Sequence, residues 1–349
     1  MTTVAVVFFP LDEQLRLRGK HWSEGLLKEL VWLSGIATYG EVEEIVARVG
    51  QVSISDSSVW RQVQRWGKGY QAQAEEERIR SNLLPGRWGS PRQRPAGPER
   101  LGVALDGTMI HIRQEGWKEL KVGAVFEVAT GRVRDERTGD WIEAAHAVGN
   151  SYVGHLGGPE VFGQMVWAEA DRRGWEQATE TEVVGDGAVW IWNLARDHFY
   201  GSEQVVDWYH AKEHLANAAR VLKGEGTSGM QRWLKAYETA LFQGKAVRIA
   251  QELELAAASH PEQAPELQRE AGYLCTNQRR MQYQELREEG WVIGSGMVES
   301  GGKQFKTRLT GPGMRWSRSG AEKLIPVRAA IMSQRFDELW PTVYNSPLN

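Results

Sequence analysis

The spacing of hydrophobic residues changes along the chain, and each spacing predicts a different kind of element. Residues 21–84 place them three and four positions apart, the period of an α-helix, as in Leu26, Leu27, Leu30, Val31 and Leu33. From residue 101, two β-rich runs, LGVALDGTMIHI and ELKVGAVFEV, flank IRQEGWK and predict a hairpin. Residues 224–290 have helical spacing throughout and carry no strand signal.

The N-terminal segment contains two helices with a short break between them. GEVEEIVARVG is followed by QVSI and then by SDSSVWRQVQRWG, with Ser55 or Asp56 placed to cap the second helix. The pattern suits a helix-turn-helix whose second helix lies in a DNA major groove, although an ordinary helical hairpin has the same pattern. We expect an inward face made of Val59, Trp60, Val63 and Trp66. The outward face, available to DNA, would hold Ser57, Ser58, Arg61 and Arg65.

The middle of the chain predicts a sheet with helices on its faces. After the hairpin comes a weaker strand, AAHAVGNSYVGHL, and then the helix GPEVFGQMVWAEADRRG. A strand TEVVGD, a helix AVWIWNLARDHF, a strand EQVVDWYH and a helix AKEHLANAARVLKG follow. Three successive strands and then alternating helices and strands describe a mixed sheet, and the order matches a ribonuclease H-like core.

These patterns divide the chain into five parts. We expect a helical helix-turn-helix domain (1–84), a Pro/Arg-rich linker (85–100), the first part of the core (101–223), a helical insertion (224–290), and the rest of the core with C-terminal helices (291–349). The predicted fold class is therefore α/β: a ribonuclease H-like mixed sheet with an all-helical insertion, preceded by an N-terminal helix-turn-helix domain.

Composition is that of an ordinary soluble globular protein, with 41% hydrophobic and 25% charged residues. No apolar stretch reaches the roughly 18 residues of a membrane span, so we expect no membrane partner. Cys275 is the only cysteine, which excludes an internal disulfide and a multi-cysteine zinc site. We expect Cys275 to be a buried apolar side chain and the protein to be cytoplasmic.

The net charge of −3 argues mildly against a nucleic-acid binder, but the charges are unevenly distributed. The segment from Arg61 to Arg100 contains nine Arg or Lys and four Glu. The segment from Ser300 to Arg335 contains eight Arg or Lys, and its one acidic residue is Glu322. Local basic blocks can attract a polyanion even when the total charge is near zero. Each block alone would also fit a solvated surface.

Three carboxylates lie in apolar settings that glycine or serine interrupts. Asp106 follows Val-Ala-Leu and Asp186 follows Val-Val-Gly, so each is expected at or near the end of a buried strand. Either aspartate alone would fit a turn after a strand. Glu299, in GSGMVESGGKQF, opens a basic helix whose glycines indicate close backbone approach. Its alternative role is a surface ion pair with Lys303, four residues on.

Together the three carboxylates could hold two divalent cations about 4 Å apart, the arrangement that drives phosphodiester chemistry. Hard oxygen ligands favour two Mg²⁺, or Mn²⁺, over zinc. Asp207 and His210, at the end of a predicted strand, would form a polar cluster beside Asp186. A zinc pair of His210 and His214 has no evident third ligand. GSGMVESGG lacks the ending of a phosphate-binding loop.

At these residues the chain resembles the DDE transposases of bacterial insertion sequences, specifically the ISKra family, which is related to Mutator-type transposases. The similar stretches cover most of the chain and follow the family's order. They are FFPLDEQL, VALDGTMIHI, GWKELKVGAVFEV, VVGDGAVWIWNLA, VVDWYHAKEHL, GSGMVESGGKQFKTRLTGPGMRWS and GAEKLIPVRAAIMS. Relatives tend to carry a zinc-ribbon-like segment before FFPLDE; here only MTTVAVV precedes it, so we expect that module to be absent or shortened.

The resemblance implies a catalytic triad of Asp106, Asp186 and Glu299, and a D-x-x-H signature at Asp207 and His210. It implies metal-dependent hydrolysis at the ends of an insertion sequence and strand transfer into target DNA. The partners would be double-stranded DNA, as terminal inverted repeats and target, and further copies of the chain in a dimer or larger assembly at the nucleoid. Phosphates near the metals would meet Lys303, Lys306, Arg308 and Arg315.

Three other interpretations stay open. A decayed or domesticated transposase would bind DNA without cutting it, and a junction resolvase would share the core but would not join DNA ends. A metabolic enzyme of a doubly wound fold is the third, although the chain has no cofactor motif.

Overall fold

A computed structural model describes residues 22–83, 98–135, 138–311 and 313–346. Its centre is one five-stranded sheet in the order β3-β2-β1-β4-β5. The first three strands are antiparallel neighbours, while β4 and β5 run parallel to β1. The predicted mixed sheet is therefore confirmed. The strands are β1 (Arg100–Ile112), β2 (Gly116–Arg134), β3 (Trp141–His155), β4 (Glu180–Gly185) and β5 (Glu203–Val206).

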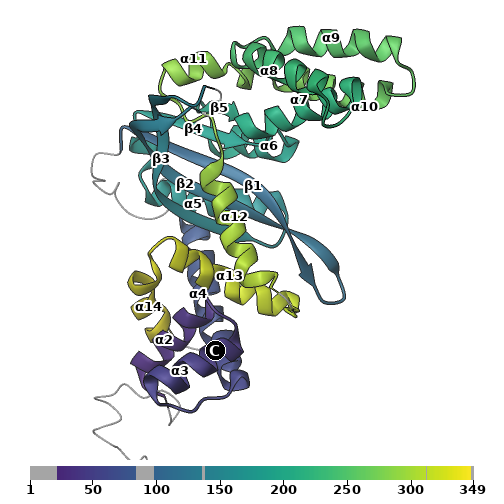
Figure 1. The fold of residues 1–349 in the computed structure, drawn as a ribbon. Helices are drawn as coiled ribbons and strands as arrows, with labels where there is room; N and C mark the ends of the chain where they lie inside the picture. The colour runs from purple at the N-terminus through teal and green to yellow at the C-terminus, as the bar shows by residue number, and fades with distance from the viewer. Residues whose placement is uncertain (1–21, 84–97, 136–137, 312, 347–349) are drawn as a thin grey trace, which may run out of the picture.

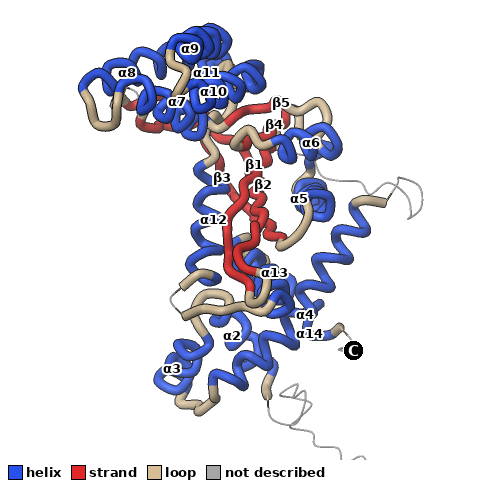
Figure 2. Tube along the Cα trace, turned by 90° about the vertical axis from the view of Figure 1, so that its right-hand side faces the viewer, coloured by secondary structure: helices blue, strands red, loops and turns tan. Residues whose placement is uncertain are grey.

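Helices cover both faces of the sheet (Figures 1 and 2). One face is covered by α12 (Gly296–Leu309) and the other by α5 (Pro159–Arg172) and α6 (Val189–His198). A helical block at one end of the molecule follows α7 (Trp208–Lys223), and the helices near both chain termini gather at the other end. The block comprises α8 (Ser228–Phe242), α9 (Ala246–Ser259), α10 (Ala264–Asn277) and α11 (Tyr283–Glu288), so residues 224–290 are mainly helical as predicted. The terminal group comprises α2 (Glu24–Ser34), α3 (Tyr39–Gly50), α4 (Asp56–Ser81), α13 (Arg318–Met332) and α14 (Phe336–Asn345).

The two faces of the sheet bury separate hydrophobic clusters because side chains alternate along a strand. On β1, Val103 and Leu105 join the cluster beneath α5 and α6, whereas Ala104 and Ile110 join the cluster beneath α12. The glycines of α12 allow its close approach: a Cβ at Gly301 would lie 2.6 Å from the ring of Tyr152. The predicted close backbone approach is thus confirmed at Gly301, whereas a Cβ at Gly296 would have no neighbouring element within 4 Å among the described residues.

Two of the predicted strand ends are wrong. Asp106 does not end its strand, because β1 continues to Ile112 and stays paired with β2 over that stretch. The strand predicted to close with Asp207 and His210 ends at Val206, and Asp207 caps the first turn of α7. Asp207 Oδ2 accepts the backbone N–H of His210 at 3.0 Å, an N-cap interaction that favours helix over continued strand.

The N-terminal helices have a small hydrophobic cluster of their own and share a second one with the C-terminal helices. Trp66 of α4 stacks on Tyr344 of α14 with ring centroids 5.2 Å apart and also contacts Trp340. Tyr70 stacks on Phe336, and its hydroxyl donates to the carbonyl of Phe336 at 3.0 Å. Residues 22–83 and 318–346 therefore form one packing unit, although the chain separates them by the whole sheet.

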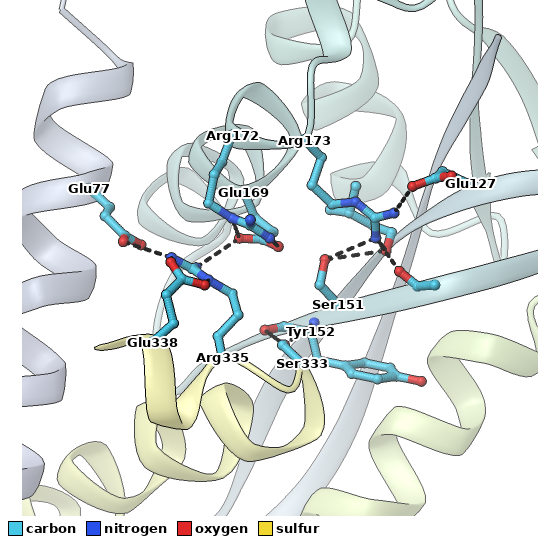
Figure 3. Close-up of polar contacts among 12 residues, drawn as sticks. Glu77, Glu127, Ser151, Tyr152, Glu169, Arg172, Arg173, Ser333, Arg335 and Glu338 are labelled. Atoms are coloured by element: carbon cyan, nitrogen blue, oxygen red, sulfur yellow. Dashed lines mark hydrogen bonds and ion pairs between the residues drawn. The ribbon is translucent and has the colours of Figure 1, made fainter. Parts of the chain in front are cut away.

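Charged side chains attach this terminal group to the sheet layer (Figure 3). Arg335, between α13 and α14, contacts Glu77 of α4, Glu169 of α5 and Glu338 of α14 at 3.1, 3.2 and 3.4 Å. Arg335 and Glu169 are largely buried, so the pair that they form loses little strength to solvent screening.

Several expectations fall on other parts of the chain. FFPLDEQL and most of the Pro/Arg-rich linker lie outside the described residues.

Cys275 is exposed on α10, so its predicted burial is wrong; its helix presents Leu267, Ala271 and Leu274 to the core instead. Among the helices within the described ranges, none combines the length and apolarity needed to cross a membrane.

Candidate active site

Asp106 and Asp186 stand side by side at the point where β4 ends. Leu105 of β1 pairs with Gly185 of β4, and this is the last pair of their parallel register. The two aspartates are the next residues on each strand. Neighbouring strands lie about 4.8 Å apart, so the two carboxylates leave the backbone at adjacent positions. The sequence pattern placed each aspartate after a buried apolar run, as the structure does, but it misjudged the length of β1.

The surroundings of Asp106 disfavour its charged form. Burial is the main cause that raises the pKa of Asp106, and the charges of Asp186 and Asp207 raise it further. The backbone N–H of Gly107, 2.7 Å from Oδ1, and the nearby His210 act in the opposite direction. Three acidic groups therefore interact at one end of the sheet with little positive charge to offset them.

The loop that carries Asp186 is fixed from the helical block. Gly187 has a φ of 99°, in the left-handed region that favours glycine. Tyr273 of α10 approaches it closely, and the Tyr273 hydroxyl donates to the Asp186 carbonyl at 2.8 Å. Asp186 Oδ1 accepts the N–H of Ala188 at 2.8 Å. The helical block thus contacts the candidate site directly and holds the backbone of the loop that carries Asp186.

Asp207 is a structural neighbour of the pair. Its side chain is only 1% exposed. Oδ1 accepts the N–H of Ser295 at 2.7 Å, and Oδ2 caps α7 at His210. His210 itself is partly exposed, with Nδ1 3.5 Å from Glu213. The predicted cluster of Asp207 and His210 beside the aspartates is present, and its geometry connects α7 to the start of α12.

Glu299 lies level with Asp106 on the facing helix. A Cβ at Gly302 would lie 4.0 Å from Cβ of Thr108, two residues beyond Asp106 and on the same face of β1. Helix α12 and β1 run in the same direction, because Gly290 lies near Arg100 and Trp316 pairs with Ile112. Three residues back on α12 are about 4.5 Å and two on β1 about 6.6 Å, so the backbone of Glu299 lies within about 2 Å of the level of Asp106 along the strand.

The Glu299 side chain pairs with Lys303. Lys303 Nζ lies 2.7 Å from Glu299 Oε1, and the glutamate side chain is 55% exposed. The surface pair that the spacing of these residues allowed is thus formed. Within the described ranges, no three His, Cys, Asp or Glu side chains form a group that could hold a metal ion. The donor set of Asp106 and Asp186 suits a hard cation, and Glu299 would have to leave Lys303 to join it.

The basic residues predicted to contact DNA near this site divide into two groups. Lys303, Lys306 and Arg315 are exposed. Arg308 is only 2% exposed, so its predicted role as a phosphate contact is wrong. Its Nε donates to the carbonyl of Ser34 at 2.7 Å, and its guanidinium packs over the rings of Tyr39 and Trp316. Helical spacing from Val298 and Phe305, both buried, directs Arg308 inward.

The helix predicted to read DNA is longer than expected but presents most of the predicted residues. Ser57, Arg61 and Arg65 are exposed on α4, and Ser58, which is partly buried, accepts a hydrogen bond from Arg61 at 2.9 Å. The predicted burial of Val59, Val63 and Trp66 is confirmed, whereas that of Trp60 is wrong because Trp60 is 47% exposed. The buried residues Val59, Val63 and Trp66 are four and three residues apart and so share one face of the helix. Trp60 is one residue from Val59 and therefore points about 100° away from that face.

Three residues near the site were not predicted from the sequence. Tyr273 donates to the backbone carbonyl of Asp186, Ser295 donates to the carboxylate of Asp207, and Glu182 lies beneath the segment that leads to α12. Only Glu182 could have been noticed, as a charged residue within the apolar run TEVVGD. The chain matches no protein-family model and has no significant match among curated proteins.

Proposed function

We propose that this protein is a DNA transposase of the DDE class that cleaves phosphodiester bonds at the ends of an insertion sequence and joins them to target DNA. The observation that carries the proposal is the convergence of Asp106 and Asp186, with Glu299 level with them on α12. The motifs that resemble the ISKra family lie on these same elements.

The topology supports this class. A sheet in the order 3-2-1-4-5, with three antiparallel strands followed by two parallel ones, is the arrangement of a ribonuclease H-like core. Residues 224–290 lie between β5 and α12, the position expected for a helical insertion before the glutamate. Contact of Tyr273 with the Asp186 loop gives the insertion a part in the site.

Two Mg²⁺ or Mn²⁺ ions would be held by Asp106, Asp186 and Glu299. Bound there, they would supply an activated water or DNA 3′-hydroxyl and stabilise the leaving oxygen of an in-line displacement. The chain contributes the position of each oxygen: Gly107 and Ala188 orient the aspartates, and Asp207 fixes the first turn beneath Glu299. Lys303 and Glu299 both lie on the exposed side of α12. A DNA phosphate would therefore pair with Lys303 in place of Glu299 and leave Glu299 able to bind the cation.

DNA recognition is assigned to α3 and α4, which would form a helix-turn-helix with the turn at 51–55. Exposed Ser57, Arg61 and Arg65 near the start of α4 suit the N-terminal end of a recognition helix. The exposed Trp60 adds an apolar side chain to this surface. Two ends of the element must be cut together, so the protein would act as a dimer or larger assembly on DNA. This assembly would lie at the nucleoid in the cytoplasm.

Arg61→Ala should weaken binding to the terminal repeat. A bidentate arginine–guanine pair contributes about 1–3 kcal/mol, which corresponds to roughly a 5- to 150-fold loss of affinity at fixed salt. Fluorescence anisotropy with the DNA that flanks the gene would measure it. Arg80→Ala is the matched control, because Arg80 is exposed near the other end of the same helix. Equal affinities of the two variants would remove α4 from recognition.

A strand-transfer assay separates this function from its alternatives. With pre-cut ends of the flanking DNA, Mg²⁺ and a target plasmid, a transposase joins the ends to the plasmid. A resolvase of the same core would cut but not join, and a decayed transposase would bind the ends without either reaction. Absence of joining and of nicking, together with tight DNA binding, would therefore favour the DNA-binding protein.

A further inference from the structure

Glu182 is a buried carboxyl group that the proposed chemistry does not use. It lies on β4 between Gly102 of β1 and Glu203 of β5, and it is 0% exposed. Oε2 accepts the backbone N–H of Val292 at 3.2 Å. Oε1 is buried without a hydrogen-bond partner among the described residues. A buried carboxylate with one unpaired oxygen is costly, so this group must be neutral or compensated.

The segment above Glu182 connects the helical block to α12. Arg100 Nη1 donates to the carbonyls of Glu289 and Gly290 at 2.8 and 2.6 Å. Glu182 holds Val292, and the N–H of Trp208 donates to the Ile293 carbonyl at 2.9 Å. Residues 289–295 are thus attached to β1, β4 and α7 by successive hydrogen bonds. We call these residues the α12 leader.

The leader determines where Glu299 stands. Asp207 accepts the N–H of Ser295, and the Ser295 carbonyl in turn accepts the N–H of Glu299 at 3.1 Å. A displacement of the leader would therefore move the first turn of α12 and the glutamate with it. Glu182 is the only side chain of the described sheet strands whose carboxyl oxygen bonds a leader backbone amide.

We propose that Glu182 is a positioning residue for Glu299: as a neutral carboxylic acid it holds the α12 leader against the sheet, and its ionisation releases the leader. The consequence for catalysis rests on the proposed function of Glu299, whereas the leader's attachment does not. Glu182 itself does not contact the reacting groups and acts only through the leader.

Burial makes the ionisation of Glu182 difficult. Burial raises the pKa of Glu182 to about 8, and Glu203 of β5 adds to the rise. The Val292 N–H and Arg100 act in the opposite direction, but Arg100 is shared with Glu180. The charges of Glu289 and Glu285 in turn raise the pKa of Glu203, after its own burial. Among the described residues, Arg100 and Glu203 are the charged groups that act on Glu182.

The direction of the pH effect follows from the raised pKa. An exposed glutamate, as in the open leader, ionises near pH 4.5, and the closed form ionises near 8. Stability of the closed form is therefore complete below the lower value and is lost as pH rises toward the upper one. Each pH unit between them should favour opening about tenfold.

Hydrogen–deuterium exchange of the full-length protein tests this, with wild type, Glu182→Gln and Glu203→Gln compared between pH 5 and 8. After correction for intrinsic exchange rates, opening of the leader should rise about tenfold per pH unit in wild type and in Glu203→Gln. It should be independent of pH in Glu182→Gln, which mimics the neutral acid. A wild-type leader whose opening does not depend on pH, or an unchanged slope in Glu182→Gln, would overturn the proposal.

Nicking of flanking DNA in Mg²⁺ then connects the leader to catalysis. The activity ratio of Glu182→Gln to wild type should increase at least tenfold from pH 6 to pH 8.5. A constant ratio, with the exchange result intact, would overturn the assignment of Glu182 to positioning Glu299. If no variant nicks DNA but the exchange result holds, the proposed function fails while the attachment of the leader stands.

Discussion

Replacing Asp106 with asparagine is expected to reduce Mg²⁺-dependent nicking of terminal-repeat DNA by a factor on the order of a thousand or more, about 4 kcal/mol in activation free energy. The amide is a poorer ligand for a hard cation and removes one of the two charges that meet where β4 ends. The same replacement removes a buried charge whose pKa is raised by burial and by Asp186.

The folded state should tolerate this change. Because the pKa of Asp106 is raised, its ionisation opposes folding at neutral pH, and the variant should unfold at the same or a higher temperature than wild type. Nicking assays and thermal denaturation on the same preparation should show that activity is lost while the unfolding temperature is not lowered. Asp197→Asn, at an exposed carboxyl near the end of α6, is the control. Activity of Asp106→Asn within tenfold of wild type would contradict the assignment.

Trp66→Ala is expected to lower the free energy of unfolding by about 3–5 kcal/mol, the cost of removing a large buried aromatic side chain. Trp66 is fully buried and contacts Trp340 and Tyr344 of α14, which lie far away in the chain. Loss of this contact should loosen the N-terminal and C-terminal helices together. Urea denaturation followed by tryptophan fluorescence and by circular dichroism would measure the change.

Trp60→Ala is the matched control on the same helix. Trp60 is half exposed, so its removal should change stability by less than about 1 kcal/mol. If Trp66→Ala had an equally small effect, or if residues 22–83 unfolded in a separate transition without α14, the shared core would be refuted. In that case the N-terminal helices would behave as an independent domain.

The periodic parts of the fold were predictable from the sequence. Alternation in LGVALDGTMIHI and helical spacing in residues 224–290 depend on near neighbours, and both predictions agree with the structure. The pair of Asp106 and Asp186 was predictable because each follows an apolar run. Their adjacency required the register of β1 and β4, which sequence spacing does not contain.

The wrong predictions share a physical cause. Arg308 and Cys275 were judged by residue type, and Trp60 was grouped with Val63 by its spacing. Their burial is instead decided by the angular position of each residue on its helix and by what packs there. Asp207 was assigned to a strand because Val205 and Val206 precede it, yet its side chain caps a helix. The α12 leader was missed because contacts across more than a hundred residues, such as Glu182 with Val292, leave no local pattern.

We propose that Glu299 joins the two aspartates around divalent cations, although its side chain pairs with Lys303 in the structure. Electron paramagnetic resonance of Mn²⁺ added to the protein–DNA complex measures this most directly. We predict that Glu299→Gln binds Mn²⁺ at least tenfold more weakly than wild type, as Asp106→Asn does, while Lys303→Ala retains binding. Wild-type Mn²⁺ affinity in Glu299→Gln would contradict the account.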